Sequence, residues 1–586
     1  MSRRVGVTLA VLVALLVGGC AAIPSSGPVV AGPPVEGDSD GGLRFQPVTP
    51  QRDALPHAVV RGFLLAASGA EDDHAFARAY LGPSTAEEWR PGAGATVFAD
   101  GSAELTLTQA GQPLASDVRP ELLDGPVSAT LTMTVVARVD ANGRFTPAPP
   151  GTRDRVEYVV EPSGGEWRIT SLPDGLVVDE AGFDLAFSPY QLYWVDRSAQ
   201  FLVPETRWFA ERRSIATSLV TELLRGPSPW LAAAVRTGFP PATTLTRPPA
   251  VPVLDGEAQV DLTGMAQQAS SEDRSLMQAQ LQATLQPVAS VSTVRMTVEG
   301  GELVLPAGRP QLVRNPGVEP VAVAVSGSGL VEVTPSGVGE VTGLPPLDGL
   351  GVSHPARGPA SYAVLAADRT RLLHLVPGTE AEPEVLLAGA SRLTAPSIDP
   401  TGWIWATARP SSGTVTAVRP GSGAVDVAAG WLDGRHVESL RVSRDGVRAL
   451  VVSVGPDGED HRLDLAAVVR RGDGRPVELT RSSGTSSTPG LVDITEAVWT
   501  GEASAAVLGR RADDARPRVL LAQPLDGFLI PLGEVPGEAV VVALAAGSGE
   551  RSILAATADG RLWQRAGTQW IEVPSETPLT DPAFGG

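Results

Sequence analysis

The chain is poor in cysteine, in lysine and in long apolar runs. Cys20 is the only cysteine in 586 residues, so no disulfide can form within the chain and its domains must be held by apolar burial. The longest apolar run, residues 5–17, is shorter than the roughly 20 residues that a membrane-spanning helix needs. A net charge of −20 argues against binding to nucleic acid and against electrostatic adhesion to anionic lipid.

The sequence also lacks the common catalytic and metal-binding motifs: it has no HExxH, no P-loop and no EF-hand loop. Residues 37–41 formally match the nucleophile elbow, but no apolar strand precedes them, as that motif requires. The acidic run at residues 71–74 is typical of the first turn of a helix. The histidines are scattered: His57, His74, His354, His374, His436 and His461. We therefore predict no catalytic residue, no metal site and no cofactor.

The first 20 residues predict an export signal with a site for lipid. Two arginines precede the apolar run, and small residues precede Cys20, as in a secretory signal peptide. Residues 17–20 (VGGC) resemble the lipobox of bacterial lipoproteins. That resemblance implies cleavage between Gly19 and Cys20, removal of residues 1–19, and an S-diacylglycerol and an N-acyl group such as palmitate on Cys20. We expect a lipid-anchored protein on the extracytoplasmic face of the cell membrane, because two acyl chains anchor stably.

Residues 20–44 predict a tether, and residues 45–180 predict a small α+β domain. The tether is rich in proline, glycine and serine and cannot bury enough apolar area to fold. In the domain, helical apolar spacing comes first and strand-like alternation follows, an order that resembles the NTF2-like arrangement. The predicted helices are 55–67 and 73–81, and the predicted strands are 103–107, 127–139, 155–162 and 167–170.

Residues 183–312 predict a second α+β unit that begins with a hairpin. Its first helix, over residues 213–225, has one apolar stripe and is stopped by Gly226. Its second helix, over 271–286, is capped by Ser270 or Ser271. The predicted strands are 191–196, 200–204, 258–262 and 291–298.

Residues 313–586 contain repeated pairs of short strands joined by polar turns. Asp399, Asp445 and Asp559 occupy equivalent turn positions in three copies, which favours a structural role for them. Asp399 and Asp445 are 46 positions apart, the length of one propeller blade. With three weaker copies, the repeats predict an all-β propeller of about six blades.

Several segments of the second unit resemble the GerMN domain of sporulation and germination proteins. They are 192–207 (LYWVDRSAQFLVPETR), 219–229 (LVTELLRGPSP), 234–245 (AVRTGFPPATTL), 258–264 (AQVDLTG) and 291–301 (VSTVRMTVEGG). With the lipobox before them and the propeller after them, their order resembles the LpqB family of actinobacterial lipoproteins. All 46 basic residues are arginine, as is typical of the high-GC genomes of actinobacteria. The expected fold is therefore multidomain, with two α+β domains and a β-propeller.

The family resemblance implies a binding and regulatory function and no enzymatic one. LpqB-like lipoproteins are linked to the Mtr two-component system, so the implied partner is the extracytoplasmic domain of its sensor histidine kinase, in cell-envelope homeostasis. A second hypothesis is a binder of peptidoglycan or another envelope glycan, which exposed aromatic side chains in a groove would favour. A third is a propeller hydrolase, which requires carboxylates or histidines that converge at the central opening.

Five side chains of the second unit are candidates for a partner or ligand surface. Arg207, Arg212 and Arg213 lie near the start of the first helix, an unfavourable place for cations. Trp194 and Trp208 belong to a group of aromatic residues that we expect mostly in the core, with a few lining a groove. The sequence does not decide whether a partner binds here or on a face of the propeller.

Replacing Cys20 by alanine tests the anchor. We expect Cys20→Ala to lose the lipid and to keep residues 1–19, because the processing enzyme acts on the lipidated cysteine. Intact mass and membrane fractionation, wild type against variant, are the measurements. An uncut variant that stays in the membrane agrees with this, since the signal itself then anchors the chain. A variant that is cleaved normally and still stays in the membrane would overturn the lipid anchor.

Overall fold

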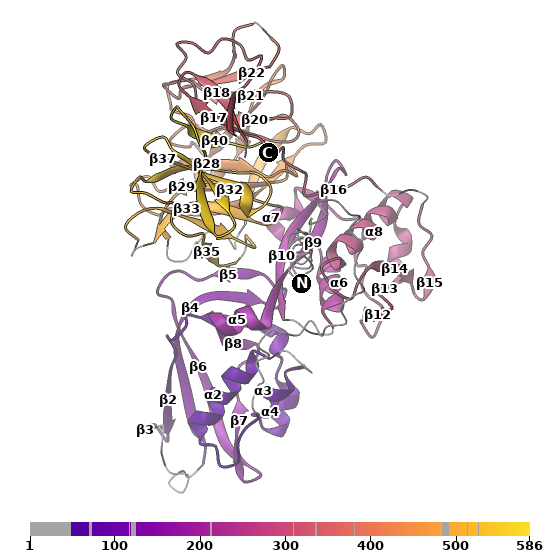
Figure 1. Cartoon of the computed structure of the whole chain (residues 1–586). Helices are drawn as coiled ribbons and strands as arrows, with labels where there is room; N and C mark the ends of the chain where they lie inside the picture. The colour runs from indigo at the N-terminus through magenta and orange to yellow at the C-terminus, as the bar shows by residue number, and fades with distance from the viewer. Residues whose placement is uncertain are drawn as a thin grey trace, which may run out of the picture. The chain divides into compact units, whose positions relative to one another are not determined.

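The computed structural model describes residues 49–585 except 70–72, 116–117, 119–122, 124, 211, 213, 307, 309, 335–336, 380, 483–490, 512–513 and 526 (Figure 1). The predicted signal peptide and tether, with Cys20, lie outside these residues. From Pro47 onward the chain forms one compact unit. Among the described residues, no helix is both long enough and apolar enough to cross a membrane.

The first domain is built on the long strand β4 (Val127–Asp140), whose residues alternate between buried and more exposed positions. Helix α2 (Pro56–Ala67) packs Val59, Val60 and Phe63 against the same core. β4 pairs with β2 and β6 along its first half and with β1 and β5 along its second. The other elements are α3 (Ala75–Arg78), α4 (Pro83–Glu88), β1 (Gly94–Phe98), β2 (Glu104–Gln109), β3 (Gln112–Leu114), β5 (Phe145–Pro147), β6 (Arg153–Ser163), β7 (Glu166–Ser171) and β8 (Leu176–Asp179).

The predicted helix 55–67 and strand 127–139 are confirmed, but the helix predicted over residues 73–81 is wrong in length. Only Ala75–Arg78 is helical. Asp73 and His74 have φ angles of 56° and 59°, in the left-handed region that a right-handed helix excludes. The likeness of this domain to the NTF2 arrangement stays a prediction.

The second domain is built on an antiparallel hairpin of β9 (Phe187–Asp196) and β10 (Phe201–Ala210), which is longer than predicted. Helix α6 (Ile215–Arg225) ends at Gly226, whose φ of 100° favours glycine. Helix α8 (Ser271–Leu285) begins after Ser270, whose Oγ accepts the Asp273 N–H at 3.1 Å. The other elements are α5 (Glu180–Ala186), α7 (Pro229–Ala232), β11 (Val235–Arg236), β12 (Val253–Leu254), β13 (Glu257–Leu262), β14 (Thr293–Val298), β15 (Gly301–Glu302) and β16 (Val313–Arg314).

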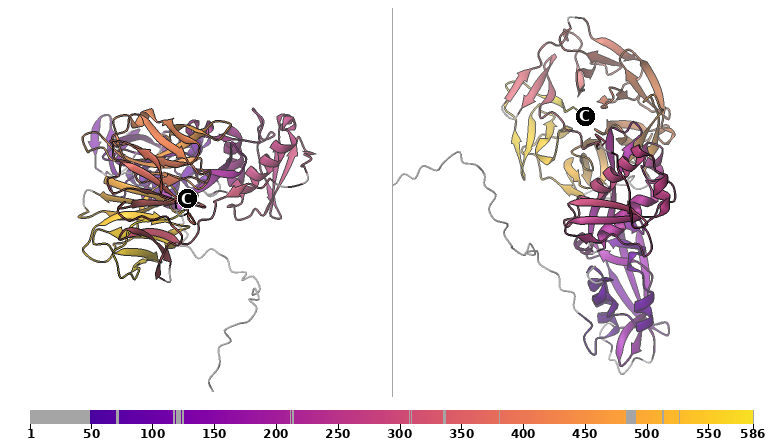
Figure 2. Two further views of the ribbon diagram at one scale, coloured as in Figure 1. Left: turned by 90° about the horizontal axis from the view of Figure 1, so that it is seen from above. Right: turned by 90° about the vertical axis from the view of Figure 1, so that its right-hand side faces the viewer.

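The third domain is a propeller of six four-stranded blades in a ring, as the right-hand view of Figure 2 shows. The strands of each blade are given below from the innermost outward. The innermost strand of each blade contacts the innermost strands of the two neighbouring blades, so the six inner strands surround the axis. Blades 1 to 3 are β40 (Thr580–Ala583), β17 (Ala322–Ser326), β18 (Gly329–Thr334), β19 (Gly337–Glu340); β20 (Ser353–Arg357), β21 (Tyr362–Leu365), β22 (Arg371–Leu375), β23 (Glu384–Ala388); and β24 (Ser397–Ile398), β25 (Ile404–Ala406), β26 (Thr414–Arg419), β27 (Gly423–Ala428). Blades 4 to 6 are β28 (His436–Val442), β29 (Arg448–Val454), β30 (Arg462–Arg470), β31 (Pro476–Arg481); β32 (Leu491–Trp499), β33 (Ala505–Arg511), β34 (Arg518–Ala522), β35 (Leu529–Pro531); and β36 (Val541–Ala546), β37 (Ile553–Thr557), β38 (Leu562–Ala566), β39 (Gln569–Glu572).

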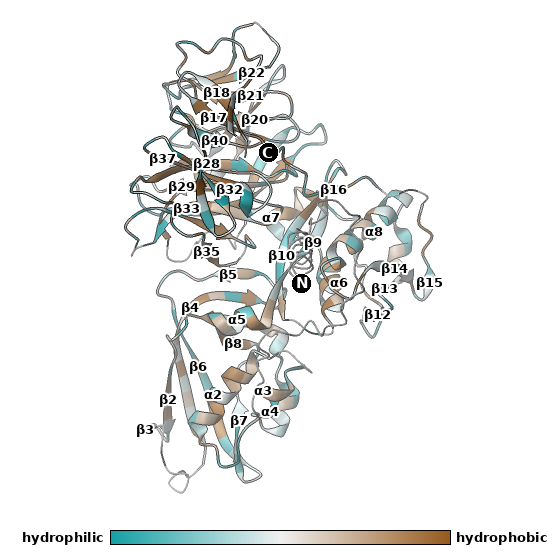
Figure 3. Cartoon of the chain, viewed as in Figure 1, coloured by the Kyte–Doolittle hydropathy of each residue, from teal (hydrophilic) through white to brown (hydrophobic). Residues whose placement is uncertain are grey.

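The ring is closed by the last strand. β40 pairs antiparallel with β17, with Ala583 opposite Val323 and Thr580 opposite Val325, and so completes blade 1 from the far end of the chain. Apolar side chains fill the space between blades: all seven residues of β29 are buried, and Figure 3 shows the apolar colour along the blade strands. Blade packing and this one pairing together hold the ring.

The six sequence copies belong to two kinds of turn. Three, around Asp399, Asp445 and residues 500–502, join the first and second strands of blades 3, 4 and 5. The others, which include Asp559, join the second and third strands of blades 1, 2 and 6. The predicted equivalence of Asp559 with Asp399 and Asp445 is therefore wrong, because both kinds of turn use the same Asp and Gly chemistry. One copy falls in each blade, so the count of six is right.

The two kinds of turn lie on opposite faces of the propeller. We call the face with the first-to-second and third-to-fourth strand turns the lower face, and the face with the second-to-third turns and the blade-to-blade connections the upper face. Lower-face turns of blades 4 and 5 contact the β9–β10 hairpin. The Tyr193 hydroxyl donates to Glu502 at 2.8 Å, Arg314 pairs with Glu502 at 2.7 Å, and Arg448 donates to the Pro204 carbonyl at 3.4 Å.

Aromatic side chains from all three domains meet beside this contact. Phe145 of β5 lies 5.2 Å from Phe528 of the lower face and 5.8 Å from Trp208 of β10, measured between ring centroids. Phe183 of α5 stacks on Phe187 of β9 at 4.9 Å and also contacts Trp208 and Phe528. We call these five rings the aromatic junction; it joins the domains through apolar burial.

Truncating one ring tests the aromatic junction. Phe528→Ala should destabilise the contact by about 2 kcal/mol, since a fully buried Phe→Ala costs roughly 3–5 kcal/mol and Phe528 is only half-buried. We expect faster limited proteolysis between the second domain and the propeller. Ile530→Ala, at an exposed position of the next strand, is the matched control. Equal proteolysis rates for the two variants would contradict a stabilising junction.

Candidate functional site

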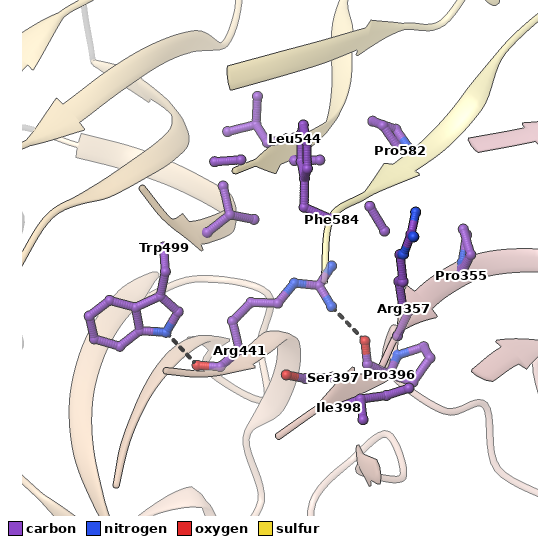
Figure 4. Close-up of a pocket in the computed structure, with 15 residues that line it drawn as sticks. Pro355, Arg357, Pro396, Ser397, Ile398, Arg441, Trp499, Leu544, Pro582 and Phe584 are labelled. Atoms are coloured by element: carbon purple, nitrogen blue, oxygen red, sulfur yellow. Dashed lines mark hydrogen bonds between the residues drawn. The ribbon is translucent and has the colours of Figure 1, made fainter. Parts of the chain in front are cut away.

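The six inner strands of the propeller surround an axial channel, and all six contribute to one cavity within it. The cavity has a volume of about 40 Å³, which holds a few water molecules and is too small for a typical ligand. Its lining includes Pro355, Arg357, Pro396, Ser397, Ile398, Arg441, Trp499, Leu544, Pro582 and Phe584 (Figure 4).

Arg441 lines this channel and bonds to the connection that enters blade 3 and to the inner strand of blade 5. Its guanidinium donates to the Pro396 carbonyl at 2.8 Å, and its own carbonyl accepts the Trp499 indole N–H at 2.9 Å (Figure 4). The guanidinium also donates to Glu496 Oε1 at 2.8 Å. The second oxygen of Glu496 accepts the Leu544 N–H at 2.7 Å. Both charged groups are therefore satisfied by the protein itself, and the channel is closed by structural bonds.

The upper mouth of the channel holds a histidine and a carboxylate. The backbone N–H of His354 donates to Asp581 Oδ2 at 3.1 Å, and the ring Nδ1 lies 3.6 Å from the same oxygen. Burial lowers the pKa of His354 to about 4; the attraction of Asp581 opposes this shift, and Arg369, Arg441 and Arg392 reinforce it. The imidazole is thus neutral at neutral pH.

The lower mouth is bordered by the connection that enters the propeller. Residues 316–319 line a cavity of about 280 Å³ together with Arg357, residues 398–400 and Arg444. Arg444 donates to the Gly547 carbonyl at 2.6 Å, and burial lowers the pKa of its guanidinium to about 10. The chain itself therefore occupies part of the lower mouth.

Two of the predicted surface residues, Trp194 and Arg207, are buried around Glu205. Arg207 pairs with Glu205 at 2.8 Å and donates to Ser228 Oγ at 3.2 Å. The Trp194 indole donates to the second oxygen of Glu205 at 3.1 Å. Trp194 is fully buried and Arg207 is 3% exposed. The prediction of a partner surface is wrong for both, because the hairpin is covered by its own helices and by the propeller.

Of the other three predicted surface residues, one is buried, one is exposed and one lies outside the described residues. Trp208 is buried in the aromatic junction, so its prediction as a surface residue is also wrong. Arg212 is exposed and donates to Ser218 Oγ at 3.0 Å. It borders a cavity of about 230 Å³ between the first domain and α6, which Trp208 also lines. Arg213 lies outside the described residues, as do Gly19 and Cys20.

Among the described residues, no group of three or more histidine, cysteine or acidic side chains is placed to hold a metal ion. Of the acidic run 71–74, only the last two residues are described: Asp73 pairs with Arg78 at 2.7 Å, and His74 packs edge-on against Trp89. Asp399 pairs with the partly buried Arg470, and Asp445 pairs with the buried Arg448. These turn aspartates therefore have the structural role that the sequence predicts.

Sequence reasoning missed the residues that close the channel, Arg441 and Glu496. Each shares its strand with a second charged residue, Glu438 in HVESLRV and Asp493 in LVDITEAVW, so the sequence does not show which charge faces inward. A charge that faces the packed side of a strand needs a partner, but the partner comes from a blade about 55 residues away.

Three family models match the chain. Residues 49–184 match the N-terminal domain of lipoprotein LpqB, residues 191–304 match a model described as sporulation and spore germination, and residues 328–585 match the β-propeller domain of lipoprotein LpqB. Together they cover most of the described residues, in the predicted order.

Curated relatives match over nearly the whole length. Lipoprotein LpqB of Streptomyces coelicolor is 30% identical, over 98% of this chain and 96% of the relative. Lipoprotein LpqB of Thermobifida fusca is 26% identical, over 94% and 96%. Among solved structures, the first GerMN domain of the sporulation protein GerM from Bacillus subtilis is 25% identical, with a TM-score of 0.18, over 21% of this chain and 92% of that domain.

Removing one partner of the channel ion pair should destabilise the propeller. Glu496→Ala removes the carboxylate that pairs with the largely buried Arg441. We expect this loss to lower the free energy of unfolding by about 3 kcal/mol. Urea denaturation followed by tryptophan fluorescence measures this. Glu576→Ala, at an exposed loop position, is the control. The double variant Arg441→Met/Glu496→Leu should recover part of the lost stability, because it removes both charges. If the double variant is less stable than Glu496→Ala, the unpaired charge of Arg441 does not explain the destabilisation.

Proposed function

Because the chain belongs to the LpqB family of lipoproteins, we propose that it is a lipid-anchored extracytoplasmic accessory of a two-component sensor kinase of the Mtr type. In this function the protein binds the extracytoplasmic domain of the kinase and tunes its signalling in cell-envelope homeostasis. The lipid on Cys20 holds both proteins at one membrane, which raises their effective concentration for each other.

The observation that carries this proposal is the unequal use of the two propeller faces. Among the described residues, the hydrogen bonds, ion pairs and ring contacts between the propeller and the other domains come from lower-face turns of blades 4 and 5 and from Arg448 beside one of them. The upper face stands outside this junction. Propellers present broad surfaces made of many turns, so the upper face is the surface that we assign to the partner.

The channel supports binding over catalysis. Its central charges, Arg441 and Glu496, are bonded to the protein. A hydrolase needs an acid or base that reaches a substrate, and the 40 Å³ cavity does not admit one. We propose no enzymatic activity.

An envelope glycan is the second candidate ligand. Binding of sugar rings favours exposed aromatic side chains, but Tyr193, Trp194, Trp208 and Phe239 of the second domain are less than a tenth exposed. Tyr190, Phe201 and Trp230 are only partly exposed. The described part of that domain therefore offers little aromatic surface to a glycan, which favours the protein partner.

Photo-crosslinking in native membranes tests the function and the face together. A photoreactive residue at Ser391 or Glu459, both exposed on upper-face connections, should crosslink to a sensor kinase identified by mass spectrometry. The matched control carries the same residue at Ser422, exposed on a lower-face turn of blade 3.

Each outcome of this experiment is decisive. Kinase adducts from the upper-face positions, and few from Ser422, support the proposal. Kinase adducts mainly from Ser422 would support the kinase as the partner but contradict its binding to the upper face. Adducts with peptidoglycan fragments and none with a kinase would replace the proposal by the glycan function.

A further inference from the structure

Three neighbouring loops on the upper face each carry an arginine, and the charges of these arginines interact. Arg369 lies in the second-to-third strand turn of blade 2, Arg392 in the connection from blade 2 to blade 3, and Arg409 in the second-to-third strand turn of blade 3. Backbone bonds join these loops: the Leu393 N–H donates to the Arg369 carbonyl at 2.7 Å, and the Arg409 N–H donates to the Arg392 carbonyl at 3.1 Å.

These loops are held in place, so the arginines are brought together by the fold. Leu393 also forms a bridge with Ala408, next to Arg409. Arg369 has a left-handed φ of 58°, a conformation that only a fixed turn maintains in a residue with a side chain. We call Arg369, Arg392 and Arg409 the arginine cluster.

The cluster carries more positive charge than its surroundings neutralise. Arg409 pairs with Glu438, but within the described residues neither Arg369 nor Arg392 forms an ion pair, and the Nε of Arg369 is buried without an acceptor. Burial and the charge of Arg392 lower the pKa of Arg369; burial, Arg369 and Arg392 lower that of Arg409. In a chain of net charge −20, three crowded cations are not explained by overall composition.

The carboxylates near the cluster do not neutralise it. Glu438 pairs with Arg409. Asp581 attracts Arg369, but within the described residues it forms no ion pair with an arginine; its Oδ2 accepts the backbone N–H of His354, and His354 stands beside the cluster as a neutral ring. A buried guanidinium N–H without an acceptor costs free energy. An incoming oxyanion would supply that acceptor and offset the mutual repulsion of the three cations.

We propose that the arginine cluster is a binding site for a compact anion, a carboxylate or phosphate group, at the upper rim of blades 2 and 3. Guanidinium groups bind both kinds of group through paired N–H···O bonds. The anion comes either as a free small molecule or as an acidic side chain of a protein. The proposal stands whether or not the protein partner is a sensor kinase.

Calorimetric titration of the full-length protein in detergent, at constant ionic strength, tests this site. The probes are inorganic phosphate, citrate and a tetraglutamate peptide. The variants are Arg369→Gln and Arg392→Gln; Arg392 is exposed, so its substitution leaves the core intact. Arg295→Gln, at an exposed position of β14 in the second domain, removes the same charge elsewhere.

We expect at least one probe to bind the wild type and Arg295→Gln equally, and each cluster variant about tenfold more weakly. Binding of phosphate or citrate identifies a free anion as the ligand; binding of tetraglutamate alone identifies an acidic segment of a partner. Equal binding by Arg392→Gln and the wild type, or no binding by any probe, would overturn the site. None of these outcomes decides whether the kinase binds the protein, which the crosslinking experiment measures separately.

Discussion

The antiparallel pairing of β40 with β17 is the constraint on which the propeller depends. It closes six blades into a ring, and only a closed ring brings inner strands from both ends of the domain to one axis. The contact of His354 with Asp581 at the upper mouth follows directly, because one residue lies on β20 and the other on β40. The bond network of Arg441 and Glu496 likewise requires blades 3 to 6 to face one channel.

The hairpin β9–β10 decides which face of this ring remains for a partner. It lies against lower-face turns through Glu502 and the aromatic junction, and the connection at residues 316–319 borders the lower mouth. The second domain therefore acts as a support for the propeller. Its own aromatic and charged side chains, such as Trp194 and Arg207, are used to build that support. The arginine cluster lies on the opposite face.

Features with a local cause were predictable from the sequence, and features caused by distant segments were not. Helix α8 follows from its Ser270 cap and β4 from strict alternation, since both signals lie within the element. The burial of Arg207 depends on Glu205 and on the cover supplied by another domain. Asp559 was misassigned because turns on both faces use the same residues. The arginine cluster has no sequence signal, because its members are spread over 40 positions in three loops separated by strands.

Closure by the last strand also sets an order of events during synthesis. The chain is made from its N-terminus, so β17 is complete about 250 residues before β40 exists to pair with it. Until then the edge of β17 is open to other strands, as any unpaired edge is. Native folding of the propeller is thus a late, whole-domain event, and a chain truncated near residue 580 would expose that edge permanently.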